Sequence, residues 1–115
     1  MEIPQHAARL RIYLGESDRL GHLPLYEAVV LKARERQLAG ATVFRGVIGF
    51  GKSSRIHTAK ILRLSMDLPV VIEIIDSLEK IEPFLPELDA MLDGGLVTVE
   101  EVRVAHYSHR TGGAA

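Results

Sequence analysis

The alternation of apolar and polar residues predicts the secondary structure of the first half of the chain. Apolar and polar positions alternate from Arg9 to Leu14, as in a strand with one buried face. Pro24 suits the first turn of a helix, and apolar residues then recur at helical spacing up to Gly40, which we expect to cap this helix. The polar segment 15–23 contains two glycines and is expected to be a loop.

Three further strands are expected in the rest of the chain. One covers roughly 41–48, and another is the apolar run 69–75, which is the strongest strand signal in the sequence. Residues 102–107 alternate and predict the last strand. The run 69–75 is apolar on both faces apart from Glu73, whereas a strand with one face in water should alternate. We therefore expect a partner subunit to cover the second face of the sheet.

A second helix is predicted between the last two strands. Its apolar stripe consists of Leu78, Ile81, Leu85, Leu88 and Leu92. Asp76 or Ser77 is expected to cap its start and Gly94-Gly95 to end it, while Pro83 and Pro86 leave open where it begins or whether it is kinked. The resulting order, β-α-β-β-α-β, predicts an α+β ferredoxin-like fold, with a four-stranded antiparallel sheet and two helices on one face.

The composition indicates one globular domain, which we expect to span residues 1–115, with a flexible tail at 108–115. Hydrophobic residues make up 47% and charged residues 25% of the chain, which argues against disorder. The absence of cysteine excludes disulfides, thiolate metal sites and cysteine catalysis. The sequence contains no run as apolar as a spanning helix and no signal-peptide pattern, so we expect a cytoplasmic protein.

Charge is segregated along the chain, although the net charge is only −1. From Arg36 to Met66 there are six positive residues and no negative one, whereas Asp67 to Glu101 contains ten acids and a single cation, Lys80. This polarity suits an anion-binding site or subunits that dock head to tail. Compensation of the two segments within one chain is the alternative.

The segment Gly46–Ser53 matches the phosphate-loop pattern GxxxxGK(S/T). A true P-loop hydrolase is disfavoured, because residues 47–50 are expected to continue the strand and the element order is not an alternation of strands and helices. A weaker interpretation remains, in which glycines and cations form a cradle for a phosphate or nucleotide. The residues of this cradle are Gly49, Gly51, Lys52 and Ser53, with Arg55 or His57 contributing from the following loop. The alternative is a solvated loop whose charges bind nothing specific.

Other chemistry finds little support in the sequence. His106 and His109 have no acidic or thiol partner nearby, so we expect no metal site. No carboxylate between Arg36 and Met66 is available to orient His57 in a triad, so we expect no enzyme. The strand 69–75 lacks the stacking aromatics and cations of an RNA recognition module, so we expect no direct nucleic-acid binding.

Two motifs carry a family resemblance. Gly40-Ala41-Thr42-Val43 and Gly49-Phe50-Gly51-Lys52 resemble the G-x-T-V…G-F-G-R/K run of the PII nitrogen-regulatory proteins, with one extra residue between the two parts. Over about residues 8–107, the chain is similar to the PII-like family called domain of unknown function one-ninety. The further runs that carry this similarity are Leu10–Glu16, Pro24–Ala28, Ser54–Ala59 and Leu68–Val71.

The resemblance implies a homotrimer whose sheets pack together at the centre and whose ligand binds in clefts between subunits. Residues 51–66 are then the equivalent of the T-loop, which reports the ligand state to a target such as a membrane transporter or channel. The small anionic ligand would be a phosphate-bearing metabolite or adenine nucleotide, and no other cofactor is implied. Together, the match and the basic loop predict the ligand-binding residues Thr42, Gly49, Gly51, Lys52, Ser53, Arg55, His57 and Arg103.

The departures from the PII pattern bear on the ligand. Ala105 replaces the second arginine of the last strand, and the TGxxGDGK loop has no equivalent beyond Asp93-Gly94-Gly95. Both changes favour a mono- or diphosphate, or no nucleotide, over a triphosphate. Uridylylation is excluded, because residues 51–66 contain no tyrosine. Two alternative functions stay open: a degenerate P-loop nucleotide phosphohydrolase and a ligand-independent trimeric interaction module.

Overall fold

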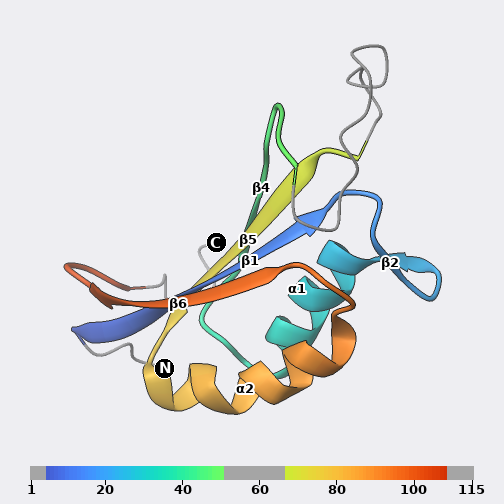
Figure 1. Ribbon diagram of the computed structural model, residues 1–115. Coiled ribbons are helices and arrows are strands. Elements are labelled where there is room, and N and C mark those ends of the chain that lie inside the picture. Colours follow the sequence, from blue (N-terminus) through green and yellow to red (C-terminus); the bar gives the residue numbers. More distant parts are fainter. Residues whose placement is uncertain (1–4, 51–66, 109–115) are drawn as a thin grey trace, which may run out of the picture.

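The computed structural model describes residues 5–50 and 67–108. Its elements are β1 (His6–Gly15), β2 (Arg19–Leu20), β3 (Leu23–Pro24), α1 (Leu25–Glu35), β4 (Thr42–Arg45), β5 (Pro69–Asp76), α2 (Leu78–Met91) and β6 (Leu96–Arg103) (Figure 1). The expected loop 51–66, with Gly51, Lys52, Ser53, Arg55 and His57, lies outside these residues. So do His109 and nearly all of the expected tail.

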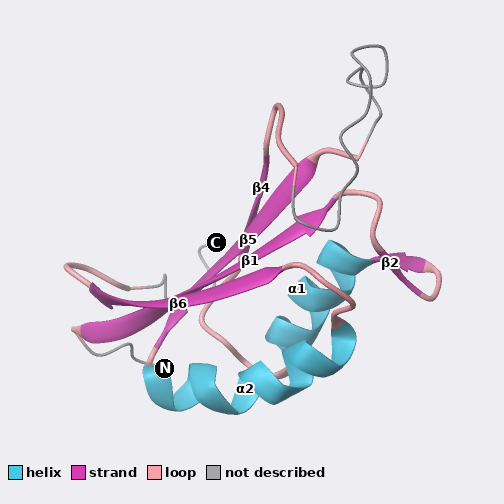
Figure 2. Cartoon of the chain, in the orientation of Figure 1, coloured by secondary structure: helices cyan, strands magenta, loops and turns pink. Residues whose placement is uncertain are grey.

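The main sheet is antiparallel, with strand order β4-β5-β1-β6, and β2 and β3 form a separate two-stranded ribbon. Both helices pack against one face of the main sheet (Figure 2). The predicted α+β ferredoxin-like fold is confirmed by this arrangement. Among the described helices, none is long and apolar enough to span a membrane.

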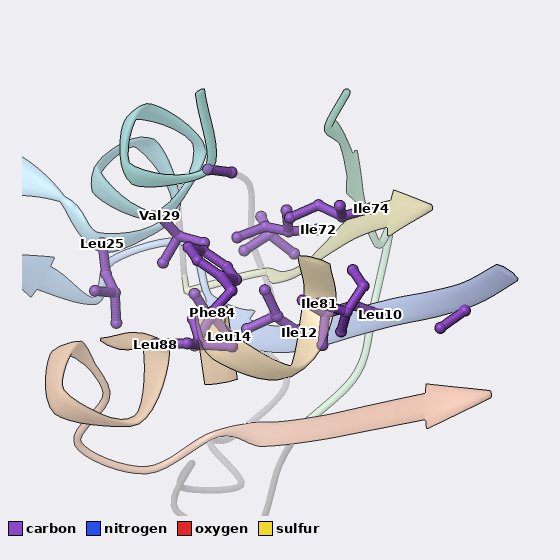
Figure 3. Close-up of a cluster of buried hydrophobic side chains, with 13 residues drawn as sticks. Leu10, Ile12, Leu14, Leu25, Val29, Ile72, Ile74, Ile81, Phe84 and Leu88 are labelled. Atoms are coloured by element: carbon purple, nitrogen blue, oxygen red, sulfur yellow. The ribbon is translucent and has the colours of Figure 1, made fainter. Parts of the chain in front are cut away.

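The hydrophobic core lies between the sheet and the two helices (Figure 3). Alternate residues of the two central strands supply the sheet side, and one stripe from each helix supplies the other side. The largest of these buried side chains are Phe84, Leu10, Ile12, Ile72, Ile74, Ile81, Leu88 and Val29. Full burial of one such side chain contributes about 1.5–3 kcal/mol, so this layer supplies most of the apolar stabilisation.

The opposite face of the sheet is uncovered within the described residues. On β5, Val71, Glu73 and Ile75 point to this face and are half-buried, while the alternate residues are buried under the helices. Two cross-strand ion pairs lie on the open face: Arg11 donates to Glu73 at 2.9 Å, and Arg9 contacts Glu100 at 2.5 Å. The expectation that helices cover one face of β5 is confirmed. The covering of the other face by a partner subunit stays a prediction.

Three boundaries in the first half differ from the sequence-based expectation. Helix α1 ends at Glu35, well before Gly40, because Gln37 adopts a left-handed φ of 60° and takes the chain out of the helix. The segment 15–23 is not entirely loop, since it forms most of the β2–β3 ribbon around Gly21. Strand β4 ends at Arg45 instead of continuing to residue 48, because its partner β5 begins only at Pro69.

In the second half, α2 begins at Leu78, directly after Ser77, and includes both Pro83 and Pro86. The buried side chains on its inner face hold the helix against the sheet despite the missing backbone donors. The last strand covers Leu96–Arg103 rather than residues 102–107, because it pairs with β1 along its whole length and β1 begins at His6.

Candidate functional site

Three of the eight predicted ligand-binding residues lie in the described part of the chain. Thr42 begins β4, Gly49 follows β4, and Arg103 ends β6; all three are exposed. The other five are Gly51, Lys52, Ser53, Arg55 and His57, which lie outside the described residues. The structure therefore shows two predicted residues that precede the segment 51–66, and the arginine of the last strand.

The glycines after β4 pack against Pro69 of β5. Gly46 donates its N–H to the carbonyl of Pro69 at 2.7 Å, and a Cβ atom on Gly46 would lie 2.7 Å from Cγ of Pro69. A Cβ atom on Gly49 would lie 3.1 Å from the same Cγ. The proline ring thus leaves no room for a side chain at Gly46 and only a tight fit at Gly49, where the sequence predicts a glycine for the approach of a ligand.

Asp67 fixes the other side of this corner. Its Oδ1 accepts a hydrogen bond from the N–H of Ser17 at 2.9 Å, and the carbonyl of Leu68 accepts one from the N–H of Glu16 at 2.7 Å. A Cβ atom on Gly15 would lie 2.6 Å from Oδ1 of Asp67, so a side chain at position 15 would displace this carboxylate. We call residues 15–18, 46–50 and 67–69 the loop-base corner, because the segment 51–66 leaves and returns there.

No motif in the sequence points to Asp67 or to its contact with Gly15. The only local signal was that Asp67 opens the acidic part of the chain. The contact itself joins residues 52 positions apart, which local periodicity does not register.

The loop-base corner exposes apolar side chains. Val47 is 91%, Ile48 66% and Phe50 70% exposed. Arg45, just before them, forms an ion pair with Glu16. The corner therefore exposes aliphatic and aromatic groups beside the Arg45–Glu16 ion pair, which suits a contact with a second surface.

Thr42 belongs to a polar row across the open face of the sheet. It lies opposite Glu73, which lies opposite Arg11, which in turn lies opposite Thr98. The hydrogen bond from Arg11 to Glu73 raises the pKa of the arginine, which stays charged. In the neighbouring row, the hydrogen bond from Arg9 lowers the pKa of Glu100.

Arg103 lies at the opposite end of the sheet from the loop-base corner. It pairs with His6 at one end of β1, whereas Pro69 pairs with Gly15 at the other end. The nine residue steps between these positions span about 30 Å of strand. β4 and β6 are also the two outer strands of the sheet. Within one chain, Arg103 and Gly49 are therefore too far apart to contact one mononucleotide.

The structure adds to the argument against P-loop chemistry. A P-loop lies between a strand and the helix whose N-terminus faces the phosphates. Here the strand that enters the motif, β4, is an edge strand paired antiparallel to β5, which is not the P-loop arrangement. The expectation that residues 47–50 continue this strand is wrong, because β4 ends at Arg45, so that part of the argument against a P-loop no longer holds. Among the described residues, no three His, Cys, Asp or Glu side chains are grouped to hold a metal ion.

Comparison with known families gives a clear match. The profile of the family DUF190, "Uncharacterized ACR", matches residues 7–104. A UPF0166 protein of Aquifex aeolicus (strain VF5) is 43% identical over 97 residues, which cover 84% of this chain and 91% of that protein. A UPF0166 protein of Methanocaldococcus jannaschii is 33% identical over 96 residues, covering 83% of this chain and 88% of the relative.

Solved structures with the same fold are PII-like proteins. CPII from Thiomonas intermedia K12, bound to ADP and bicarbonate, superposes with a TM-score of 0.60 at 19% identity, covering 88% of this chain and 90% of CPII. A putative PII-like signaling protein from Thermus thermophilus gives a TM-score of 0.61 at 19% identity, covering 86% and 89% of the two chains. At this identity, the likeness establishes a common fold.

Proposed function

The chain belongs to the DUF190 family, as its motifs predicted, and we propose that it acts as a PII-like regulatory protein. In this proposal, three copies form a cytoplasmic homotrimer that binds a small anionic ligand, an adenine nucleotide, in the clefts between subunits. Residues 51–66 then transmit the ligand state to a target protein, such as a membrane transporter or channel. The chain itself catalyses no reaction.

The position of Arg103 is the observation that carries this proposal. Thr42 and Gly49 lie on or beside β4, whereas Arg103 ends β6 at the far end of the sheet. One ligand contacts both groups only when they come from different copies. This separation supports a cleft between subunits, and the +6 and −9 charges of the two segments favour head-to-tail contacts.

A nucleoside mono- or diphosphate is the ligand class that we propose. CPII, which shares the fold, has been solved with ADP, AMP and bicarbonate. In this chain, Ala105 and the short turn Asp93-Gly94-Gly95 leave few cations for a third phosphate. Calorimetric titration with ADP, AMP, ATP and bicarbonate tests the order of affinities, in which ADP or AMP is expected to exceed ATP.

Point variants test the residues of the cleft. A charge-assisted hydrogen bond contributes roughly 1.5–3 kcal/mol, so Arg103→Ala and Lys52→Ala should each weaken nucleotide binding by about 10- to 150-fold. Thr42→Val keeps the shape of the side chain and removes one neutral hydroxyl, so a loss of about 2- to 12-fold is expected. Arg34→Ala, an exposed arginine of α1, is the matched control and should leave the affinity unchanged.

Mixed assemblies test whether the cleft lies between subunits. Arg103→Ala and Lys52→Ala chains are denatured, mixed in equal amounts and refolded together. Random assembly places an intact Lys52 beside an intact Arg103 in about a quarter of the clefts, so about a quarter of the tight sites should return. If each site lay within one chain, mixing would restore none of them, and the proposed cleft would be wrong.

The same preparations distinguish the alternatives. Multiple-turnover phosphate release that disappears in Lys52→Ala would favour the P-loop phosphohydrolase over a regulatory protein. A trimer that binds its target equally with and without nucleotide would favour the ligand-independent interaction module.

A further inference from the structure

Arg45 is the one charged residue on β4 or in the residues next to it. The sequence from residue 37 to residue 50 contains no other Asp, Glu, Lys or Arg. Arg45 stands between Thr42 and Gly49, the two predicted site residues that the structure describes before the segment 51–66. A phosphate group bound next to Thr42 and Gly49 therefore has Arg45 as the cation that this strand supplies.

The chain bends immediately after Arg45. Gly46 donates its N–H to the carbonyl of Pro69 at 2.7 Å. A Cβ atom on Gly46 would lie 2.7 Å from Cγ of this proline, and a Cβ atom on Gly49 would lie 3.1 Å from it, so both glycines lie against one ring. Gly49 is four residues from Arg45 in the sequence, but the bend keeps it close to the end of β4 in space.

Glu16 holds the side chain of Arg45 in its present position. Nη2 of Arg45 donates to Oε2 of Glu16, which is the partner that Arg45 has among the described residues. Glu16 directly follows β1, and β5 lies between β1 and β4, so the arginine reaches across a separation of about 10 Å at the end of the sheet (Figure 1). The backbone of Glu16 is fixed in turn, because its N–H donates to the carbonyl of Leu68 at 2.7 Å.

Arg45 keeps most of its hydrogen-bonding capacity in this ion pair. The side chain of Arg45 is 62% exposed, whereas that of Glu16 is 25% exposed. A guanidinium carries five N–H donors in a planar fork, and Glu16 engages a single nitrogen of it. Ion pairs with this much solvent contact are weak, while a guanidinium binds a phosphate strongly through two parallel hydrogen bonds. A phosphate next to β4 can therefore replace Glu16 as the partner of Arg45.

We propose that Arg45 binds a phosphate group of the ligand and leaves Glu16 to do so. This inference rests on the nucleotide site of the proposed function and adds two residues to it, one that contacts the ligand and one that competes with the ligand. The two anions are alternative partners because they lie on opposite sides of Arg45. Glu16 lies toward β1, whereas the proposed cleft lies along the edge of β4 that no strand of the described chain covers.

The exchange of partners leaves the loop-base corner in place. Its backbone contacts do not involve the side chain of Arg45 or of Glu16. These contacts are Gly46 to Pro69, Glu16 to Leu68 and Ser17 to the carboxylate of Asp67. Changes at the two paired side chains should therefore alter ligand binding without unfolding the corner.

Calorimetric titration with ADP tests the role of Arg45. Arg45→Ala and Arg45→Gln should each weaken ADP binding by about 5- to 50-fold, because both lose the charged contact with phosphate while Arg45→Gln keeps most of the side chain. Glu16→Gln should instead tighten ADP binding by about 1.5- to 5-fold, because the arginine no longer leaves a carboxylate. Arg34→Ala and Glu27→Gln, which change exposed residues of α1, are the matched controls and should bind as the parent does. Circular dichroism and sedimentation equilibrium check folding and assembly.

A double variant separates this exchange from simple repulsion between Glu16 and the ligand. If Glu16 acts by holding Arg45, Glu16→Gln should have no effect on ADP affinity in the Arg45→Ala background. We expect this result, because a carboxylate on the far side of β5 is largely screened from the ligand at ordinary salt. An equal gain from Glu16→Gln in both backgrounds would overturn the exchange.

The outcomes distinguish this inference from the proposed function. A parent chain that does not bind ADP would contradict the nucleotide site of the proposed function, and this inference with it. A parent chain that binds ADP no more tightly than Arg45→Ala and Arg45→Gln would overturn the role of Arg45 alone. Weaker binding in both Arg45 variants, with a gain from Glu16→Gln that disappears in the double variant, is the result that supports the exchange.

Discussion

Asp76 is the one fully buried charged side chain among the described residues, and its removal offers a sharp test of the fold. It ends β5 and lies beneath the start of α2. Its Oδ1 accepts the N–H of Ser77 at 2.6 Å, and its Oδ2 accepts the N–H of Ala39 at 2.9 Å. One carboxylate therefore joins the start of α2 to the connection between α1 and β4.

The expected cost of Asp76→Ala follows from these two bonds. A hydrogen bond to a charged group contributes roughly 1.5–3 kcal/mol, and an orphaned buried N–H costs a similar amount. In the variant, water hydrogen-bonds in part to the N–H of Ser77, because this group lies at the start of α2. The variant also no longer buries a charge, and both effects reduce the loss of stability. We therefore expect the free energy of unfolding to fall by about 2–4 kcal/mol. Asp76→Asn, which keeps one acceptor, should lose less.

Urea unfolding followed by circular dichroism measures this effect. With a urea dependence of roughly 2 kcal/mol per molar, the transition midpoint of Asp76→Ala should fall by about 1–2 M. All samples are compared at one protein concentration, because assembly contributes to apparent stability. Asp89→Ala removes an exposed acid from α2, the helix that follows Asp76, and is the control. A midpoint for Asp76→Ala equal to that of Asp89→Ala would refute the structural role of the buried carboxylate.

Two further predictions concern the sheet and the surface. Ile72→Asp puts a charge into a fully buried core position and should abolish folding or assembly. The control, Leu78→Asp, changes a position that is 46% exposed and should not. A stable, oligomeric Ile72→Asp protein would contradict the burial argument. The hydrogen bond from Arg36 lowers the pKa of Glu87 below its ordinary value of 4.5. The ion pair therefore stabilises the folded protein fully above that pH, and this stabilisation is lost as the pH falls through the lowered pKa. Between about pH 7 and pH 3, the urea midpoint of Glu87→Gln should therefore fall less steeply with decreasing pH than that of the parent chain. An equal slope in the two proteins would contradict this prediction.

The order of elements could be predicted from the sequence because the core-forming residues follow clean periods. The helical spacing of Ile81 and Leu88 and the alternation around Ile12 both reflect burial against one layer, which a local pattern records. Leu78, at the start of the same predicted stripe, is 46% exposed instead. The end points were less predictable. β6 was placed too late, because an edge strand buries only part of its residues and its extent is set by pairing with β1. Gln37 ended α1 in a left-handed conformation that the sequence pattern assigned to glycine.

The candidate site shows a different limit of sequence reasoning. A motif collects Thr42, Gly49 and Arg103 into one binding set, but it does not say which copy of the chain supplies each member. The register of β1 with its two neighbours separates Arg103 from the loop-base corner by the length of the sheet, so one small ligand that contacted both would have to lie between copies. If the set acts together, ligand binding and subunit assembly are thermodynamically linked. A nucleotide bound between copies must then stabilise the trimer by mass action, and dilution toward monomers must weaken nucleotide binding.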